Sequence, residues 1–278
     1  MKTIVTHIYP DVDAIASVWL IHRFLPGWDD AEVSFVPAGE TLNNQPPDDN
    51  PQIIHVDTGL GRFDHHQTSK HTCASQLVLR HLIEENIIKA NYHEALERMI
   101  GVVTDIDHFQ EVFLPDADSD IYDFLLINII EGLKIKYAND HKIIEIGESL
   151  MDGLLQSFFA KVHAEREIKK GLTFDSKWGK TLACESDNEE VVRLAQKKGF
   201  SMVIRKSIKK GHLRIKVLPN SKLDLKEIYD VLKSKDLKAS WFYHASGHMI
   251  LNGSAKNPKS IPTKLTLAQA VGIVKKMQ

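Results

Sequence analysis

The sequence predicts an α/β protein: a parallel sheet flanked by helices, followed by a second, smaller α/β domain. Short apolar runs typical of buried strands alternate with amphipathic helical segments over the first 170 residues. The same alternation restarts after Gly171, which is suited to end a helix. The formal charge also changes sign between the halves: residues 1–164 hold 11 Lys and Arg against 26 Asp and Glu, and residues 165–278 hold 24 against 11.

The first half begins with a buried strand at 3–6, and Pro10 marks a turn before an amphipathic helix from about 13 to 24. Two further apolar runs predict strands at 33–36 and 53–56, separated by a loop rich in Pro, Asn and Asp. Apolar residues at helical spacing then predict four helices, at 75–89, 91–102, 118–137 and 140–170.

The second half repeats this alternation on a smaller scale. The predicted elements in order are a strand at 181–184, a helix at 187–198, strands at 201–205 and 213–217, a helix at 224–235, a strand at 249–251 and a helix at 266–276. We place a linker near 165–178, and therefore expect a first domain at 1–165 and a second at 179–278.

Composition excludes several classes of protein. With 43% hydrophobic residues, 278 residues suffice for one large core or two ordinary ones, so the chain is no disordered tail. No apolar stretch approaches a membrane-spanning length, and we expect no membrane partner. The two cysteines form no disulfide framework and no leader is visible, so we expect a cytoplasmic protein.

The basic second half, with a net charge of +13, is the natural docking surface for a polyanion. On charge alone, two solvated surfaces that attract each other explain the asymmetry equally well. Arg205 and Arg214 lie on predicted strands joined by a turn at Gly211, and such a basic hairpin could follow a phosphate backbone.

Histidine and aspartate follow the predicted strands of the first half. His7 ends the first strand, Asp11 and Asp13 open the next helix, and Asp57 follows the third strand. Parallel strands deliver their carboxyl ends to one edge of a sheet, so we expect these groups to meet there. His65 follows shortly after, and Asp105 has the same apolar-then-acidic setting.

Such a cluster demands cations. Four carboxylates gathered with two histidines would repel one another by several kcal/mol, and two divalent ions would cancel the four charges. Oxygen and imidazole ligands suit Mn²⁺, which is our first choice, or Mg²⁺ and Fe²⁺. Two such ions can share a water and direct it at phosphorus, which predicts hydrolysis of phosphoesters.

Each residue also has a plainer explanation. Asp11 and Asp13 could cap a helix, His65 and His66 could be a surface pair, and Asp105 could be an ordinary acid at an element's end. Taken together, these explanations require that Asp and His residues follow several successive strands by independent coincidence.

The triplet Asp64-His65-His66, preceded by Asp57-Thr58-Gly59 and by the His7…Asp11-Val12-Asp13 pattern, resembles the motif set of the DHH phosphoesterase superfamily. The motifs span about residues 1–110. The resemblance implies a di-metal hydrolase whose members include single-strand exonucleases, oligoribonucleases, cyclic-dinucleotide phosphodiesterases and manganese pyrophosphatases.

The resemblance also implies roles for individual residues. His7, Asp11 and Asp57 would hold one metal ion. A second ion would be held by a set that shares Asp57 as a bridge, namely Asp13, Asp57, His65 and Asp105. His66 would contact the scissile phosphate and Asp64 would orient the histidine pair. A fourth motif lies at residues 102–108, where Asp107 and His108 compete with Asp105 for the ligand role.

The second half resembles the DHH-associated substrate domain, with Ser246-Gly247-His248 in place of that domain's Gly-Gly-His motif. Around the first site, Lys70 precedes a helix N-terminus suited to a phosphate oxygen. The expected substrate-binding residues are therefore His66, Lys70, Arg205, Arg214, Gly247 and His248.

We expect a phosphoesterase that hydrolyses short single-stranded oligonucleotides or nucleotides with a di-manganese-activated water. The alternatives are a cyclic-dinucleotide phosphodiesterase, a manganese pyrophosphatase, or a nucleic-acid-binding protein without catalysis. The sequence does not decide the oligomeric state, and a homodimer is one of the alternatives.

Overall fold

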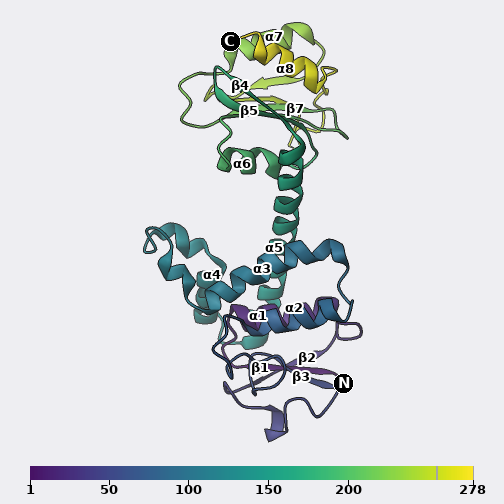
Figure 1. Ribbon diagram of the computed structural model, residues 1–278, viewed down its shortest axis with the longest axis vertical. Coiled ribbons are helices and arrows are strands. Elements are labelled where there is room, and N and C mark those ends of the chain that lie inside the picture. Colours follow the sequence, from purple (N-terminus) through teal and green to yellow (C-terminus); the bar gives the residue numbers. More distant parts are fainter. Residues whose placement is uncertain (255, 278) are drawn as a thin grey trace. The chain divides into compact units, whose positions relative to one another are not determined.

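A computed structural model describes residues 1–254 and 256–277 (Figure 1). The chain divides into two compact units, residues 1–159 and 160–278. The boundary falls inside one helix, α5 (Asp140–Lys170), which begins in the first unit and ends in the second. The segment 165–178, where the sequence predicted a linker, contains the end of this helix, a complete strand at Leu172–Ser176 and the turn after it.

The sheet of the first unit has three parallel strands in the order β2-β1-β3. The strands are β1 (Thr3–His7), β2 (Glu32–Val36) and β3 (Ile53–His55). The central strand is apolar and β-branched, as a strand paired on both sides requires, and its three middle residues are buried. All three strands point the same way, so their carboxyl ends lie at one edge.

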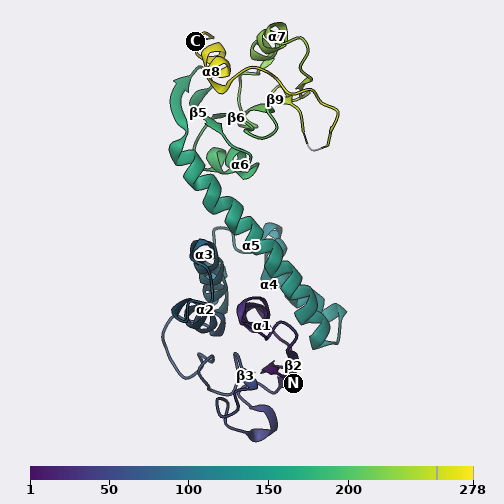
Figure 2. The same ribbon diagram turned by 90° about the vertical axis from the view of Figure 1, so that its right-hand side faces the viewer.

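Helices α1 and α2 lie on one side of this sheet in both views (Figures 1 and 2). The long helices besides α5 are α1 (Val12–Phe24), α2 (Ala74–Glu84), α3 (Ala90–Asp107) and α4 (Leu126–Lys136). Three short 3-10 helices accompany them, at Leu42–Asn44, Gln110–Phe113 and Asp120–Phe124. The helix predicted over 118–137 is divided because Leu125 has an extended backbone.

The second unit is built on a six-stranded sheet in the order β4-β5-β6-β7-β9-β8. Only β5 and β6 pair in parallel, and the other neighbours are antiparallel. The strands are β4 (Leu172–Ser176), β5 (Gly179–Glu185), β6 (Met202–Lys206), β7 (Leu213–Val217), β8 (Trp241–Tyr243) and β9 (Met249–Asn252).

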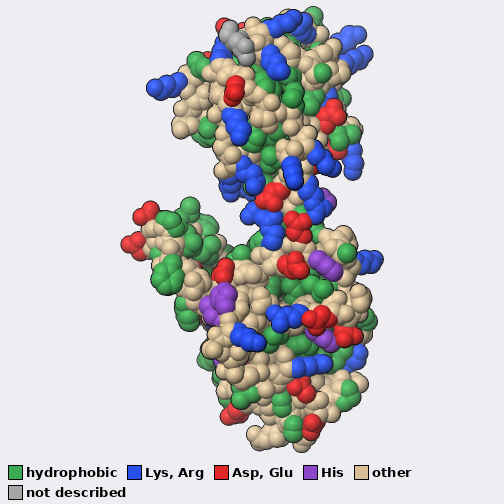
Figure 3. Space-filling model, viewed as in Figure 1, with side chains coloured by type: hydrophobic (Ala, Val, Ile, Leu, Met, Phe, Trp, Pro, Cys, Tyr) green, Lys and Arg blue, Asp and Glu red, His purple; other side chains and the backbone are tan. Residues whose placement is uncertain are grey.

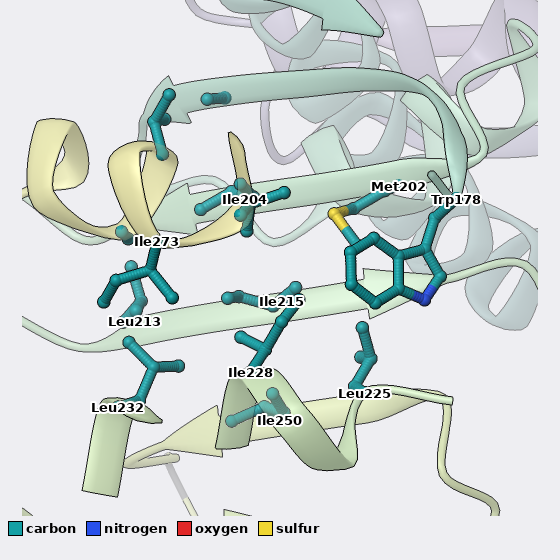
Figure 4. Close-up of a cluster of buried hydrophobic side chains, with 14 of the residues drawn as sticks. Trp178, Met202, Ile204, Leu213, Ile215, Leu225, Ile228, Leu232, Ile250 and Ile273 are labelled. Atoms are coloured by element: carbon teal, nitrogen blue, oxygen red, sulfur yellow. The ribbon is translucent and has the colours of Figure 1, made fainter. Parts of the chain in front are cut away.

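Three helices cover this sheet: α6 (Glu190–Lys197), α7 (Lys226–Lys235) and α8 (Leu267–Lys275). The larger core joins α7 and α8 to one sheet face through residues such as Ile204, Ile215 and Ile228 (Figure 4). A smaller core on the opposite face joins α6 and the end of α5 to β5 and β6 through Leu182 and Val203. These cores bury the apolar stripes that predicted the elements.

The charges separate between the units as the sequence predicted. Residues 1–159 hold 10 Lys and Arg against 26 Asp and Glu, and residues 160–278 hold 25 against 11. Lys and Arg side chains are spread over the visible face of the second unit (Figure 3). Within the described part of the chain, no helix combines the length and apolarity that crossing a bilayer requires.

Candidate metal centre

The ends of two neighbouring parallel strands place the first ligands. β1 ends at His7, and Asp57 lies two residues beyond the end of β3. Asp57 is 3% exposed and its φ of 56° lies in the left-handed region, which an Asp tolerates better than most residues. Held strain of this kind is frequent at functional sites.

The N-terminus of α1 places two further carboxylates. Oδ1 of Asp11 caps the helix by accepting hydrogen bonds from the backbone N–H groups of Asp13 (2.9 Å) and Ala14 (3.0 Å). Asp13 is 2% exposed and accepts from the backbone N–H groups of Ala74 (2.7 Å) and Ser75 (2.9 Å) at the start of α2. Asp11 therefore caps a helix, and its Oδ2 still faces His7 at 3.9 Å.

The segment after Asp57 brings the histidine pair to the same place. The buried Asp64 accepts a hydrogen bond from the backbone N–H of Leu60 (2.7 Å) and bonds Nδ1 of His66 through Oδ1 (2.7 Å). This bond orients the His66 ring, whose side chain is 59% exposed. The side chain of His65 is only 13% exposed and turns inward.

These residues form three overlapping groups of candidate ligand atoms, each within 4.8 Å: His7, Asp11 and Asp57; Asp13, His65 and Asp107; and Asp57, His65 and His66. The two oxygens of the Asp57 carboxylate face two different histidines. Its Oδ2 lies 3.2 Å from Nε2 of His7, and its Oδ1 lies 3.4 Å from Nε2 of His65. Asp57 is thus placed to serve both sets of ligands.

Three buried ligand atoms that make no hydrogen bond show that the residues fit a metal ion. Oδ1 of Asp57, Nε2 of His65 and Oδ2 of Asp107 are buried and have no hydrogen-bond partner within the described structure. An unpaired buried polar atom costs about 1–3 kcal/mol, more when charged. On the other side, Nδ1 of His7 bonds the carbonyl of Ile8 (2.8 Å), which leaves Nε2 as its ligand nitrogen.

Asp105, which we expected to bind the second ion, lies outside the cluster. Asp107 lies within it. Both lie on α3, where two residues correspond to a rotation of about 200° around the helix. The Asp107 side chain is 14% exposed and its Oδ2 lies 3.6 Å from Nε2 of His65. The Asp105 side chain is 59% exposed and bonds His71 at 3.1 Å.

The buried carboxylates and imidazoles of the cluster shift one another's pKa values. Burial lowers the pKa of His7, but the carboxylates of Asp57 and Asp11 outweigh it and raise that pKa to about 9. The nearby Asp57 carboxylate likewise raises the pKa of His65 to about 9. Burial, with repulsion from Asp57, raises the pKa of Asp13 to about 7. Divalent ions binding here would displace these protons.

A cavity of about 640 Å³ opens beside the cluster. Asp11, Asp13, His65, His66 and Asp107 line it. Its wall also contains residues that sequence reasoning did not assign to the site, namely Tyr9, Thr68, Phe109, Ile127, Glu131 and Lys134. The last three come from α4, and no sequence signal near the motifs indicates them.

Other expected substrate-binding residues are placed differently. Lys70 is exposed and lies outside the residues that line this cavity. In the second unit, Arg205 is 4% exposed, so it is a buried residue and no open surface group. It lines a cavity with Arg214, but Gly247 and His248 are not among the residues that line it. Gly247 instead sits in a turn against Asp224 and Tyr243.

A family model described as "ChrB, C-terminal domain" matches residues 4–158. This match covers more than half of the chain. The chain belongs to the ChrB C-terminal domain family. The family match and the first compact unit end within one residue of each other. This family differs from the DHH phosphoesterase superfamily, which the motifs of the first unit resemble.

Among curated proteins, no sequence matches this member of the ChrB C-terminal domain family. Solved structures that match it include a crystal structure described as that of a family II inorganic pyrophosphatase from Methanococcus jannaschii. The identity is 15%, and the alignment covers 100% of this chain and 99% of that chain. With a TM-score of 0.23, this likeness carries no argument about function.

Proposed function

We propose that the first unit is a metal-dependent phosphoesterase centre of the DHH type. The observation that carries the proposal is the cluster of three overlapping Asp and His groups, two of which contain Asp57, with three buried ligand atoms that make no hydrogen bond. His7, Asp11 and Asp57 would hold one ion, and Asp13, His65 and Asp107 would hold the other with Asp57. The bound ions would supply an activated water and neutralise charge on the phosphoryl oxygens.

The donor set supports Mn²⁺ as the resident ion, with Mg²⁺ or Fe²⁺ as alternatives. The groups contain carboxylate oxygens and imidazole nitrogens, which these ions accept. Cys73 is buried beside Ser75 and Thr104, and its sulfur lies 3.2 Å from each hydroxyl oxygen. Burial raises the pKa of this thiol, so it offers no thiolate for zinc.

Two side chains of the cavity wall would act on the phosphate group. His66, held through Nδ1 by Asp64, keeps its Nε2 edge for a phosphate oxygen. Lys134 is 15% exposed and pairs with Glu131 at 2.6 Å, so its ammonium is fixed in the wall of the cavity. Both groups would bind and orient the substrate.

The shape of the cavity supports a substrate that carries an organic group. Tyr9 and Phe109 line it, are 67% and 70% exposed, and both hold a φ of 55° in the left-handed region. Exposed aromatic rings on strained backbone at the rim of a polar site are suited to stack a nucleobase. We therefore favour nucleotides or short single-stranded oligonucleotides over pyrophosphate, with cyclic dinucleotides next. A cytoplasmic location and the oligomeric state remain predictions.

Hydrolysis assays test the proposal. The full chain is incubated with bis-p-nitrophenyl phosphate, a short oligonucleotide and pyrophosphate, each with Mn²⁺ and with a chelator. We expect Mn²⁺-dependent turnover of both esters and loss of turnover in Asp57→Asn. Turnover of pyrophosphate alone would make the centre a pyrophosphatase. Oligonucleotide binding with no turnover of any substrate would identify a binding protein without catalysis.

A further inference from the structure

The face of the second sheet opposite α7 and α8 is only partly covered. The smaller core with α6 covers it over β5 and β6. On β7 and β9, the strand register places Arg214, Lys216, Met249 and Leu251 on this same face. These four side chains are all partly exposed, whereas alternate residues of both strands are buried. The uncovered part of the face is therefore basic and apolar at once.

Two arginines stand directly opposite each other on this face. Arg205 of β6 pairs in register with Arg214 of β7. Like charges directly opposite each other on neighbouring strands destabilise a sheet. Here the carboxylate of Glu189 bridges them: one oxygen accepts from Nη2 of Arg205 at 2.5 Å, and the other accepts from Nη1 of Arg214. The bridge leaves one net positive charge on the three groups.

The bridge does not satisfy the arginines. Nε of Arg205 and Nε of Arg214 are both buried and have no hydrogen-bond partner in the described structure. The Arg205 side chain is 5% exposed, so water does not compensate for its unpaired N–H. The Glu189 side chain itself is 62% exposed, so solvent reaches most of it.

A cavity of about 600 Å³ lies at this place and is lined by both arginines. Its wall adds three lysines, Lys209, Lys210 and Lys256, against the carboxylates of Asp187 and Glu189. Asp187 already accepts hydrogen bonds from the hydroxyl of Ser207 (2.5 Å) and the backbone N–H of Lys209 (3.2 Å). Met249 and Leu251 form an apolar part of the lining. The volume suits one nucleotide-sized ligand.

We propose that Arg205 and Arg214 form a phosphate-binding site of the second unit, and that Glu189 occupies the place of the phosphate until a phosphate ester displaces it. A phosphate monoester carries up to two charges and three terminal oxygens, so it can accept from the Nε and Nη groups of two guanidiniums. The carboxylate offers one charge and two oxygens. Met249 and Leu251 would face the organic part of the ester, which makes a nucleoside monophosphate the simplest ligand.

This inference deepens the proposed function and rests on the nucleotide substrate class proposed there. It concerns binding by the second unit alone and needs no metal ion. The tests below use the full chain with EDTA. A negative hydrolysis assay would not affect these binding tests. Negative binding tests would not affect the proposal of metal-dependent hydrolysis.

The first test weakens the internal competitor. AMP binding is measured by isothermal titration calorimetry for the wild type and for Glu189→Gln. We expect the dissociation constant for AMP to fall at least threefold in E189Q, because the neutral amide competes less well for the arginines. The matched control is Glu190→Gln, which removes the neighbouring carboxylate that pairs with Arg193 at 2.7 Å, and should leave AMP binding unchanged.

The second test removes one of the two arginines that would bind the phosphate. Arg214→Gln should weaken AMP binding at least tenfold, and Arg193→Gln on α6 should not change it. If R214Q unfolds, Lys210→Gln serves instead, because this exposed residue lines the same cavity; we expect a loss of twofold or more.

Thermal unfolding distinguishes a binding site from a purely structural network. AMP should raise the melting temperature of E189Q more than those of the wild type and E190Q. Equal AMP affinity in the wild type, E189Q and R214Q would overturn the proposal, as would destabilisation of E189Q that AMP does not relieve. In either case the Arg–Glu–Arg contact serves only the stability of the sheet.

Discussion

Replacing Asp107 by Asn should abolish tight binding of divalent metal, whereas replacing Asp105 by Asn should not. The two acids are two residues apart on α3, so the matched pair tests the position of the side chain. Only their side-chain positions differ. Oδ2 of Asp107 is buried, accepts no hydrogen bond and lies 3.6 Å from Nε2 of His65, whereas Asp105 bonds His71 at the surface.

The structure sets the size of each effect. Changes to groups that merely support metal ligands cost about 10- to 100-fold in affinity, so loss of the proposed ligand Asp107 should cost about 100-fold or more. That factor corresponds to about 2.7 kcal/mol. The Asp105 pair is exposed on both sides, which limits its worth to about 0–1 kcal/mol of stability. Metal affinity of D105N should therefore stay within about threefold of the wild type.

Titration calorimetry with Mn²⁺ measures both affinities, and thermal unfolding without metal supplies the control. Burial raises the pKa of Asp107, so its charged form is disfavoured in the metal-free protein. The neutral Asn should consequently leave the metal-free melting temperature unchanged or raise it, while Mn²⁺ should no longer increase it. Wild-type affinity in D107N together with a tenfold loss in D105N would refute the placement of the ligands.

Two further predictions concern the stability of the first unit. His22 bonds Glu148 through Nδ1 (2.7 Å) and a backbone carbonyl through Nε2 (3.1 Å), and only the doubly protonated ring can donate both bonds. Burial lowers the pKa of His22, but Glu148 outweighs it and raises the pKa above 6.5; the stability gained is thus complete below pH 6.5 and lost as pH rises through the folded-state value. His22→Gln should therefore cost about 1–2 kcal/mol more in urea unfolding at pH 5.5 than at pH 9, and an equal cost at both would exclude the charged pair. Gly147→Ala on α5 would place its Cβ 2.6 Å from Cγ2 of Ile15 and should destabilise by about 1–3 kcal/mol, whereas Gly153→Ala on the same helix meets no atom within 4 Å and should stabilise by up to about 1 kcal/mol. Urea unfolding of the two alanine variants checks this, and a stabilised G147A would contradict the close packing of α5 on α1.

The strands that the sequence missed share one physical property. β4 and β8 are the two edges of the second sheet, and only one neighbour pairs with each. Their burial patterns contain no fully buried residue, whereas β5, β6 and β7 each bury three or four. An edge strand needs no continuous apolar run, so its sequence resembles that of a loop. The interior strands were predictable because they must be apolar.

The candidate site was predictable wherever a ligand follows a strand of the parallel sheet. His7 and Asp57 belong to this class, because the sheet fixes the direction in which their segments leave it. The choice between Asp105 and Asp107 was not predictable, since it depends on the rotation of α3 and on where that helix ends. The position of Lys134 could not be predicted for another reason. Tertiary packing places α4 in the wall of the cavity, and this packing leaves no pattern in the local sequence.

The burial of both cysteines has a practical consequence for handling the protein in air. Cys73 and Cys184 are buried, and burial raises the pKa of each thiol, that of Cys184 to about 12. Oxidants attack thiolates, so neither sulfur is an easy target. If the proposed activity is lost under oxygen and returns when ferrous ion and a reductant are added anaerobically, the loss would point to iron bound at the proposed centre and not to oxidation of cysteine.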